Sequence, residues 1–216
     1  MHTQPQRSSI TFPHGFLDFL KLSPGRRHRV GEYELQPDRL STFNLALHAL
    51  CPEAPAMTLD QIVTAAERAR SRHADGSTPP FVASRMRALQ RLEAMAVDPG
   101  WNASAELRRQ VAVLQAYRAD GNDLIPDSQP VIGLLDDAVL VDVALQLLQG
   151  ELADYEDFCQ FRRVAAEFAD VPEDSTDLTR EHWLEAMAQA RISRARIDGA
   201  TDHYVPDPRV SLFHIG

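Results

Sequence analysis

The sequence predicts an all-α protein, an irregular bundle of about six to seven helices with an N-terminal arm and an extended C-terminal tail. Apolar residues recur at spacings of three and four through most of the chain after residue 36. The chain has 216 residues, 44% hydrophobic and 25% charged, so it is long enough to bury such a core. Cys51 and Cys159 stand over a hundred residues apart and form no ligand spacing, so we expect both to be reduced.

Three regions differ in composition. Residues 1–36 contain prolines, glycines and short apolar patches, which predicts an irregular arm with one short hairpin. Within this arm, the basic cluster at 26–29 is interpreted as a solvated turn, with contact to a phosphate or an acidic surface as the alternative. Residues 37–198 carry the helical pattern and are expected to form a single domain. Residues 199–216 contain two prolines and predict an extended tail that docks on the body or on a partner subunit.

The first two predicted helices have defined ends. Pro37 suits the first turn of a helix, where its missing N–H is not needed, and Pro52 stops that helix. Thr58 and Gln61 form a capping box at the start of the second helix. Both segments carry apolar residues at helical spacing, so we expect each to bury one face.

Two further helices follow. The third begins after the prolines at 79–80 and ends before Pro99, and the fourth runs from Asn102 to Tyr117. Each combines an apolar stripe with an arginine-rich opposite face, which is typical of helices that pack against a core.

The remaining helices lie in the second half of the chain. One begins around residues 131–133 and ends near Gly150. The next covers Glu151–Asp170 with a broad apolar arc that includes Phe168 and Cys159, and Cys159 is interpreted there as a small core residue. The last is capped by Thr179 and is stopped by Gly199, with Trp183, Leu184, Met187 and Ile192 facing inward.

The segment from residue 123 to the start of the 131–150 helix has specific content. Pro126 and Pro130 predict a rigid turn in place of a helix. On the following helix, Asp142 falls on a polar side, whereas Asp137 falls in the middle of the apolar arc. An unpaired carboxylate there would be costly, so some group must satisfy Asp137.

Two interpretations of these carboxylates are open. In the structural one, which we favour, Asp137 is stabilised by the first turn of its helix, by donors from the preceding turn, or by an arginine such as Arg108 or Arg109. In the other, the carboxylates converge as oxygen ligands for Mg²⁺ or Ca²⁺ in a metal-dependent hydrolase. The four carboxylates concerned are Asp123, Asp127, Asp136 and Asp137.

The residues of this segment also resemble a known family. The matching positions are Tyr117, Asp123 to Asp127, Pro130 to Gly133, and Leu135 to Asp137. Their spacing is similar to that of the YkvA-like domain of unknown function, found in many bacterial proteins, over about residues 107–150. The resemblance implies a short helix-turn-helix unit that is often predicted to be membrane-associated, and it implies no established activity or cofactor. The candidate site residues are Asp123, Pro126, Asp127, Pro130, Gly133, Asp136 and Asp137.

An integral membrane span is not expected. Residues 131–148 approach the length of roughly 20 that a bilayer requires. However, each of three aspartates costs about 2.5–3.5 kcal/mol at a helix centre, while each apolar residue returns only about 0.3–0.6 kcal/mol. The first residues show no apolar segment typical of a secretory signal, so we expect a cytoplasmic protein. Peripheral contact with the inner membrane is the alternative.

The charge distribution suggests the class of function. The net charge of −9 disfavours a nucleic-acid binder, which normally presents a basic face. Residues 1–118 hold 15 basic and 11 acidic side chains, and residues 179–216 hold equal numbers of each. The whole excess of negative charge therefore lies in residues 119–178. We therefore predict a non-catalytic interaction or regulatory protein whose acidic region faces a protein partner or a second copy. The metal-dependent hydrolase and a peripheral membrane protein are the alternatives.

Overall fold

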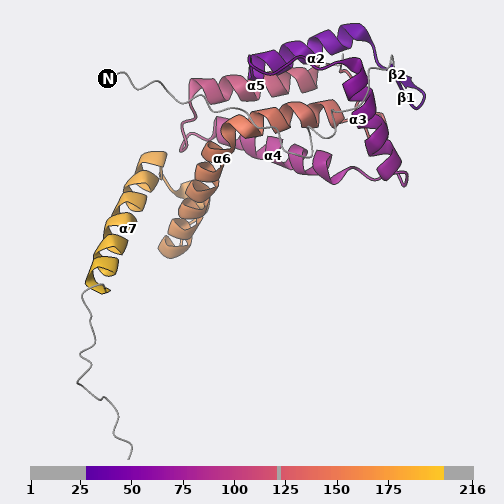
Figure 1. Cartoon of the computed structure of the whole chain (residues 1–216). Helices are drawn as coiled ribbons and strands as arrows, with labels where there is room; N and C mark the ends of the chain where they lie inside the picture. The colour runs from indigo at the N-terminus through magenta and orange to yellow at the C-terminus, as the bar shows by residue number, and fades with distance from the viewer. Residues whose placement is uncertain (1–27, 121–122, 202–216) are drawn as a thin grey trace, which may run out of the picture. The chain divides into compact units, whose positions relative to one another are not determined.

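A computed structural model of the chain describes residues 28–120 and 123–201. The described part is helical apart from one short hairpin, which confirms the predicted fold class (Figure 1). Most of the predicted N-terminal arm, including Arg26 and Arg27, and the tail from residue 202 lie outside the described residues.

The helical region contains two compact units. Among the described residues, unit 1 comprises those up to Asp98 together with those of Ala103–Tyr155, and unit 2 comprises Pro99–Asn102 and those from Glu156 onward. Each unit is described by itself below.

Unit 1 begins with the hairpin that was predicted in the arm. Strand β1 (Arg29–Val30) pairs antiparallel with β2 (Tyr33–Glu34), and Gly31 in the turn has a φ of 57°. This left-handed conformation favours glycine, which has no Cβ to clash. The Gly31 N–H donates a hydrogen bond of 2.8 Å to Glu67 Oε1, which attaches the hairpin to the next but one helix.

The first two helices form as predicted. Helix α2 (Pro37–Leu50) has proline in its first turn, and α3 (Leu59–Arg72) starts with the complete capping box. In that box, the Gln61 N–H donates to Thr58 Oγ1 at 3.4 Å and the Thr58 N–H donates to Gln61 Oε1 at 2.8 Å. Both backbone N–H groups, which lack a partner within the helix, are therefore hydrogen-bonded by neighbouring side chains.

Helix α4 (Pro80–Val97) follows its prolines, whereas α5 (Ala105–Ala119) starts three residues later than predicted. The reason is its cap. The Ser104 hydroxyl accepts a hydrogen bond of 3.1 Å from the Leu107 N–H, and Asn102 has a φ of 50° in the turn before it.

Helix α6 (Leu135–Ala169) is one continuous helix of 35 residues, so the predicted break at Gly150 is wrong. A glycine inside a helix costs about 1 kcal/mol relative to alanine, which neighbouring packing can offset. The predicted start around residues 131–133 is also wrong. These residues belong to the turn, and Val131 has a φ of 71° that a helix excludes.

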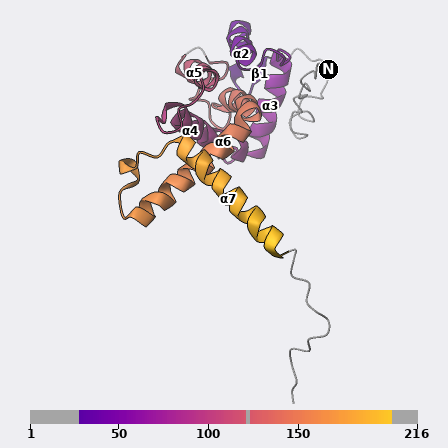
Figure 2. The ribbon, with the colours of Figure 1, turned by 90° about the vertical axis from the view of Figure 1, so that its left-hand side faces the viewer.

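The core of unit 1 surrounds the first half of α6. In both views α2, α3, α4 and α5 lie around it (Figures 1 and 2). Every residue from 135 to 144 is buried, and Phe43 of α2 meets Tyr117 of α5 edge to face at 6.0 Å between ring centroids.

Unit 2 has a small aromatic core. Trp101 stacks at a tilt against Phe158 of α6 at 5.6 Å and against Trp183 of α7 (Arg180–Thr201) at 5.9 Å. The Arg180 guanidinium lies 4.0 Å from the Trp101 ring centroid. A short 3-10 helix, η1 (Glu173–Ser175), connects α6 to α7.

Several predictions for unit 2 are wrong. Of the α7 residues predicted to face inward, only Trp183 is buried, and Leu184, Met187 and Ile192 are exposed. Phe168, assigned to the apolar arc of the preceding helix, is exposed as well, and Cys159 is half-buried. Helix α7 also continues through Gly199 to Thr201. The helical spacing therefore identified the apolar faces of these helices, but it did not show whether other residues pack against those faces.

Candidate functional site

The turn that contains the candidate residues is anchored by two buried side chains. The Tyr117 hydroxyl donates a hydrogen bond of 2.7 Å to Asp136 Oδ2 and accepts one of 3.2 Å from the Leu124 N–H. Asp136 Oδ2 also accepts from the Ile125 N–H at 3.2 Å. Because Tyr117 lies in the last turn of α5 and Asp136 in the first turn of α6, these bonds hold the turn against both helices.

A second set of contacts supports the turn from the N-terminal side. The Tyr33 hydroxyl of the hairpin donates to the Leu124 carbonyl at 3.2 Å. Arg39 of α2 donates to the Tyr33 hydroxyl at 3.2 Å and to the Asp123 carbonyl at 3.0 Å. The turn is thus fixed by residues up to 91 positions away in the chain.

Gly133 and the two prolines shape the backbone of the turn. A Cβ on Gly133 would lie 2.3 Å from the Asp127 carbonyl oxygen, a separation that side-chain carbons do not adopt. The Gly133 N–H donates to the Gln129 carbonyl, and the Gln129 N–H donates to the Pro126 carbonyl. Gly133 is therefore required by a close backbone approach, and Pro126 starts the turn that brings it about.

Burial dominates the electrostatics of the motif. Asp136 and Asp137 are only 1% and 4% exposed. Burial raises the pKa of Asp136 to about 6, in spite of its hydrogen bonds, and that of Asp137 to about 7. The carboxylates of Asp136, Asp127 and Asp123 raise the pKa of Asp137 further, whereas Arg118 lowers it. Burial, with help from Asp127 and Asp120, raises the pKa of Asp123 to about 6.

Of the two arginines predicted as possible partners of Asp137, Arg109 has other partners. Arg109 pairs with Glu106, at 2.6 Å between the guanidinium and the carboxylate, and donates to the Ala49 carbonyl. Asp137 instead lies at the first turn of α6, where the free N–H groups favour an acid.

The four motif aspartates influence one another but do not form a set of metal ligands. Asp127 is exposed and the other three are buried. Among the described residues, no three His, Cys, Asp or Glu side chains are grouped so that they could hold a metal ion. The Mg²⁺ or Ca²⁺ site therefore has no support from the side-chain arrangement in this part of the chain.

Asp142 was assigned to the polar side of its helix, and this is wrong. It is 5% exposed, and Arg85 of α4 donates to its Oδ1 at 2.6 Å. Gln146 donates to its other oxygen at 3.3 Å. The cost of placing a carboxylate in so apolar a helix predicts a partner, but only the packing of α4 identifies it.

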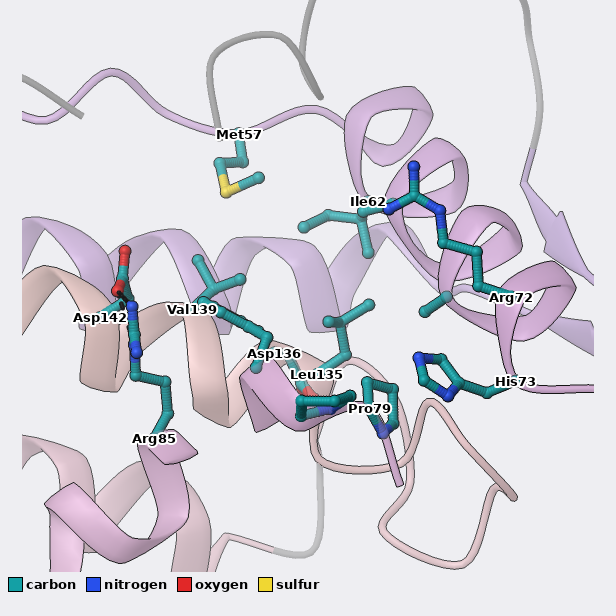
Figure 3. Close-up of a pocket in the computed structure, with 14 residues that line it drawn as sticks. Met57, Ile62, Arg72, His73, Pro79, Arg85, Leu135, Asp136, Val139 and Asp142 are labelled. Carbon is teal, nitrogen blue, oxygen red and sulfur yellow. Dashed lines mark hydrogen bonds and ion pairs between the residues drawn. The ribbon is translucent and has the colours of Figure 1, made fainter. Parts of the chain in front are cut away.

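Sequence reasoning also missed a cavity of about 390 Å³ in unit 1, between α3, α4 and the start of α6 (Figure 3). Its wall is mainly aliphatic, and the polar side chains on it are Arg72, His73, Arg85, Asp136 and Asp142. Arg72 and His73 lie toward one end of the view and the Arg85–Asp142 pair toward the other (Figure 3).

Comparison of the chain with models of protein families, with curated proteins and with solved structures finds no match. The resemblance to the YkvA-like domain therefore stays a prediction. Within the described ranges, no helix is both long and apolar enough to cross a membrane.

Proposed function

We propose that this chain is a non-catalytic interaction protein that associates with a second copy of itself through unit 2. The observation that carries the proposal is Phe168 near the end of α6, whose side chain is 94% exposed. Val164, one helical turn before it, and Val171 beyond the helix are exposed as well. A phenylalanine side chain left in water loses roughly 1.5–3 kcal/mol that burial would supply, so a partner surface is favoured here.

Helix α7 offers a matching surface. Leu184, Met187 and Ile192 lie within one arc of the helix and are exposed. All side chains from 187 to 196 are exposed, so, among the described side chains of α7, those that a core holds lie in its first turn around Trp183. Helices in proteins gain most of their stability from packing of an apolar face, so a partner on this face would stabilise α7.

The charges of the two surfaces are complementary. Residues 156–170 of α6 and its end contain four acidic and two basic side chains. Residues 187–196 of α7 contain three arginines and no acidic side chain. A two-fold dimer would place each α7 on the α6 of the other copy, so the contact would form twice. The acidic region thus serves as the partner-facing surface that the charge distribution predicted.

The oligomeric state of the full chain tests the proposal. Sedimentation velocity from low to high micromolar concentration is expected to show a monomer–dimer equilibrium. Phe168→Asp and Leu184→Asp should each shift it toward monomer, because each introduces a charge into the apolar contact. The matched control is Leu45→Asp on α2 of unit 1, where the leucine is 71% exposed and no effect on the dimer is expected.

Charge reversal tests the pairing itself. The double variant Arg191→Glu, Arg194→Glu should weaken association, and so should Glu167→Lys, Asp170→Lys, because each repels the unchanged surface of its copy. Combining all four substitutions in one chain should restore the dimer. A wild-type chain that stays monomeric over the whole range, or a dimer that ignores all these variants, would show the proposal to be wrong.

A further inference from the structure

We propose that the cavity of unit 1 binds a small amphiphile, a medium-chain carboxylate with one apolar chain and one anionic head group. This site lies in unit 1 and is independent of the association proposed for unit 2. A volume of about 390 Å³ falls in the lower part of the roughly 300–1,000 Å³ range of ligand sites. It suits a single short chain and excludes two-chain lipids.

The wall of the cavity suits an alkyl chain. Three helices contribute to it, each with the residues just before it where these line the cavity: α3, α4 and the first turns of α6. Their apolar side chains are Met57, Ile62, Ala65, Ala69, Pro79, Pro80, Phe81, Leu135 and Val139. Alanine at two positions of one face of α3 leaves the space, because larger side chains there would fill it. Moving an alkyl chain from water into such a wall is favourable in proportion to the apolar surface that it buries.

The charges place the head group at the α3 end. Arg72 is exposed and lines the cavity, and Figure 3 shows it at the same end of the view as His73. Within the described part of the chain, Arg72 makes no ion pair, and the ring of His73 next to it forms a hydrogen bond of 3.1 Å with Ser77 Oγ. An arginine guanidinium can bind a carboxylate by two parallel hydrogen bonds. Arg72 is therefore the residue that would bind the carboxylate head group.

The other polar groups disfavour an anion deeper in the cavity. The charge of Arg85 is already neutralised by Asp142, which it contacts at 2.6 Å. The buried carboxyl of Asp136 would repel an anion when ionised. The chain would therefore extend toward Val139 with its carboxylate remaining near Arg72.

Isothermal titration calorimetry of the full chain with sodium decanoate tests the proposal. The decanoate concentration is kept below the critical micelle concentration. Saturable binding with one site per chain is expected. Decanol has the same chain without the charge and should bind more weakly, and the decyltrimethylammonium cation should bind weakest. Arg72→Gln should weaken decanoate about tenfold while leaving decanol unchanged. The matched control is Arg70→Gln, which removes an arginine of the same helix that pairs with Glu67 away from the cavity.

Filling the cavity separates this site from adsorption to the surface. Ala69→Phe should abolish binding of both decanoate and decanol, with the helical circular dichroism spectrum as a check on folding. Ala69→Leu provides a milder substitution, and it should weaken both ligands if the larger one unfolds the chain. The proposal is wrong if folded wild-type protein takes up no decanoate, or if binding survives the Ala69 substitutions. Equal affinity for decanol, with no effect of Arg72→Gln, would contradict the carboxylate class.

Discussion

Both halves of α6 carry apolar residues, but the first half is buried and the second leaves large apolar side chains exposed. In unit 1, residues 135–144 are all buried, including three aspartates. In unit 2, the same helix leaves Val164 and Phe168 exposed. The difference teaches that apolar content does not decide burial by itself. Four helices surround the first half, whereas the described part of unit 2 offers a core of three aromatic rings.

The halves also differ in what their unusual residues do. Buried carboxylates in the first half have partners or neighbours inside unit 1, so their substitution should change stability. Exposed apolar side chains in the second half have no such role, so their substitution should change association and leave stability unaltered. The following predictions test this contrast.

The largest loss of stability is expected from Asp142→Ala. It leaves the half-buried Arg85 without its anion, and breaking a buried pair costs about 3–5 kcal/mol, reduced here by the partial exposure of Arg85. Urea unfolding followed by circular dichroism would measure this. As a control, Arg70→Ala removes the exposed partner of Glu67, leaves Glu67 in place for its hydrogen bond from the Gly31 N–H, and should cost no more than about 1 kcal/mol. Equal losses from both variants would contradict the contrast between buried and exposed pairs.

A smaller loss is expected from Tyr117→Phe. The substitution keeps the ring against Phe43 but removes the hydroxyl that donates to Asp136 and accepts from the Leu124 N–H. Leaving these buried groups unpaired should cost about 1–3 kcal/mol in the same unfolding experiment. Tyr33→Phe, whose hydroxyl is only partly buried, should cost less. A Tyr117→Phe variant as stable as wild type would show that this network does not hold the turn.

The pH dependence of stability should follow the buried aspartates. The pKa values of Asp123, Asp136 and Asp137 are about 6, 6 and 7 in the folded chain, above the ordinary value of 3.8. The folded chain therefore binds more protons than the unfolded one between about pH 4 and 7, so stability should fall as the pH rises through this range.

Thermal unfolding from pH 5 to pH 8 would measure this fall, to which all three carboxyl groups should contribute. Asp137→Asn, which is neutral at every pH, should reduce the slope. A stability that rises toward pH 8 would indicate that a cation or a basic partner neutralises these carboxylates.

The smallest effect on stability is expected for Phe168→Ser in unit 2. Since this side chain is exposed, the free energy of unfolding of the monomer should change by less than about 0.5 kcal/mol. The measurement is urea unfolding at a concentration where the chain is monomeric. A loss comparable to that of Tyr117→Phe would mean that Phe168 is covered within the chain, and the surface proposed for association would lose its main residue.

Local signals in the sequence predicted much of the fold. The first turn of α2 and the capping box of α3 depend on residues within a few positions, and both formed as expected. The burial of Asp137 followed from helical geometry alone. The break at Gly150 failed because a single glycine sets only a local cost of about 1 kcal/mol, which the rest of a long helix overcomes.

What the sequence by itself determined about this protein is the helical class, most helix ends and the position of the motif, because caps, prolines and apolar periodicity act over one or two turns. Only the tertiary structure decided the partners across the chain, such as Arg85 for Asp142, which lies 57 positions away. It also decided which stripes are covered, and it brought α3, α4 and α6 around a cavity. The physical reason is that burial and pairing depend on neighbours in space, which local spacing does not specify.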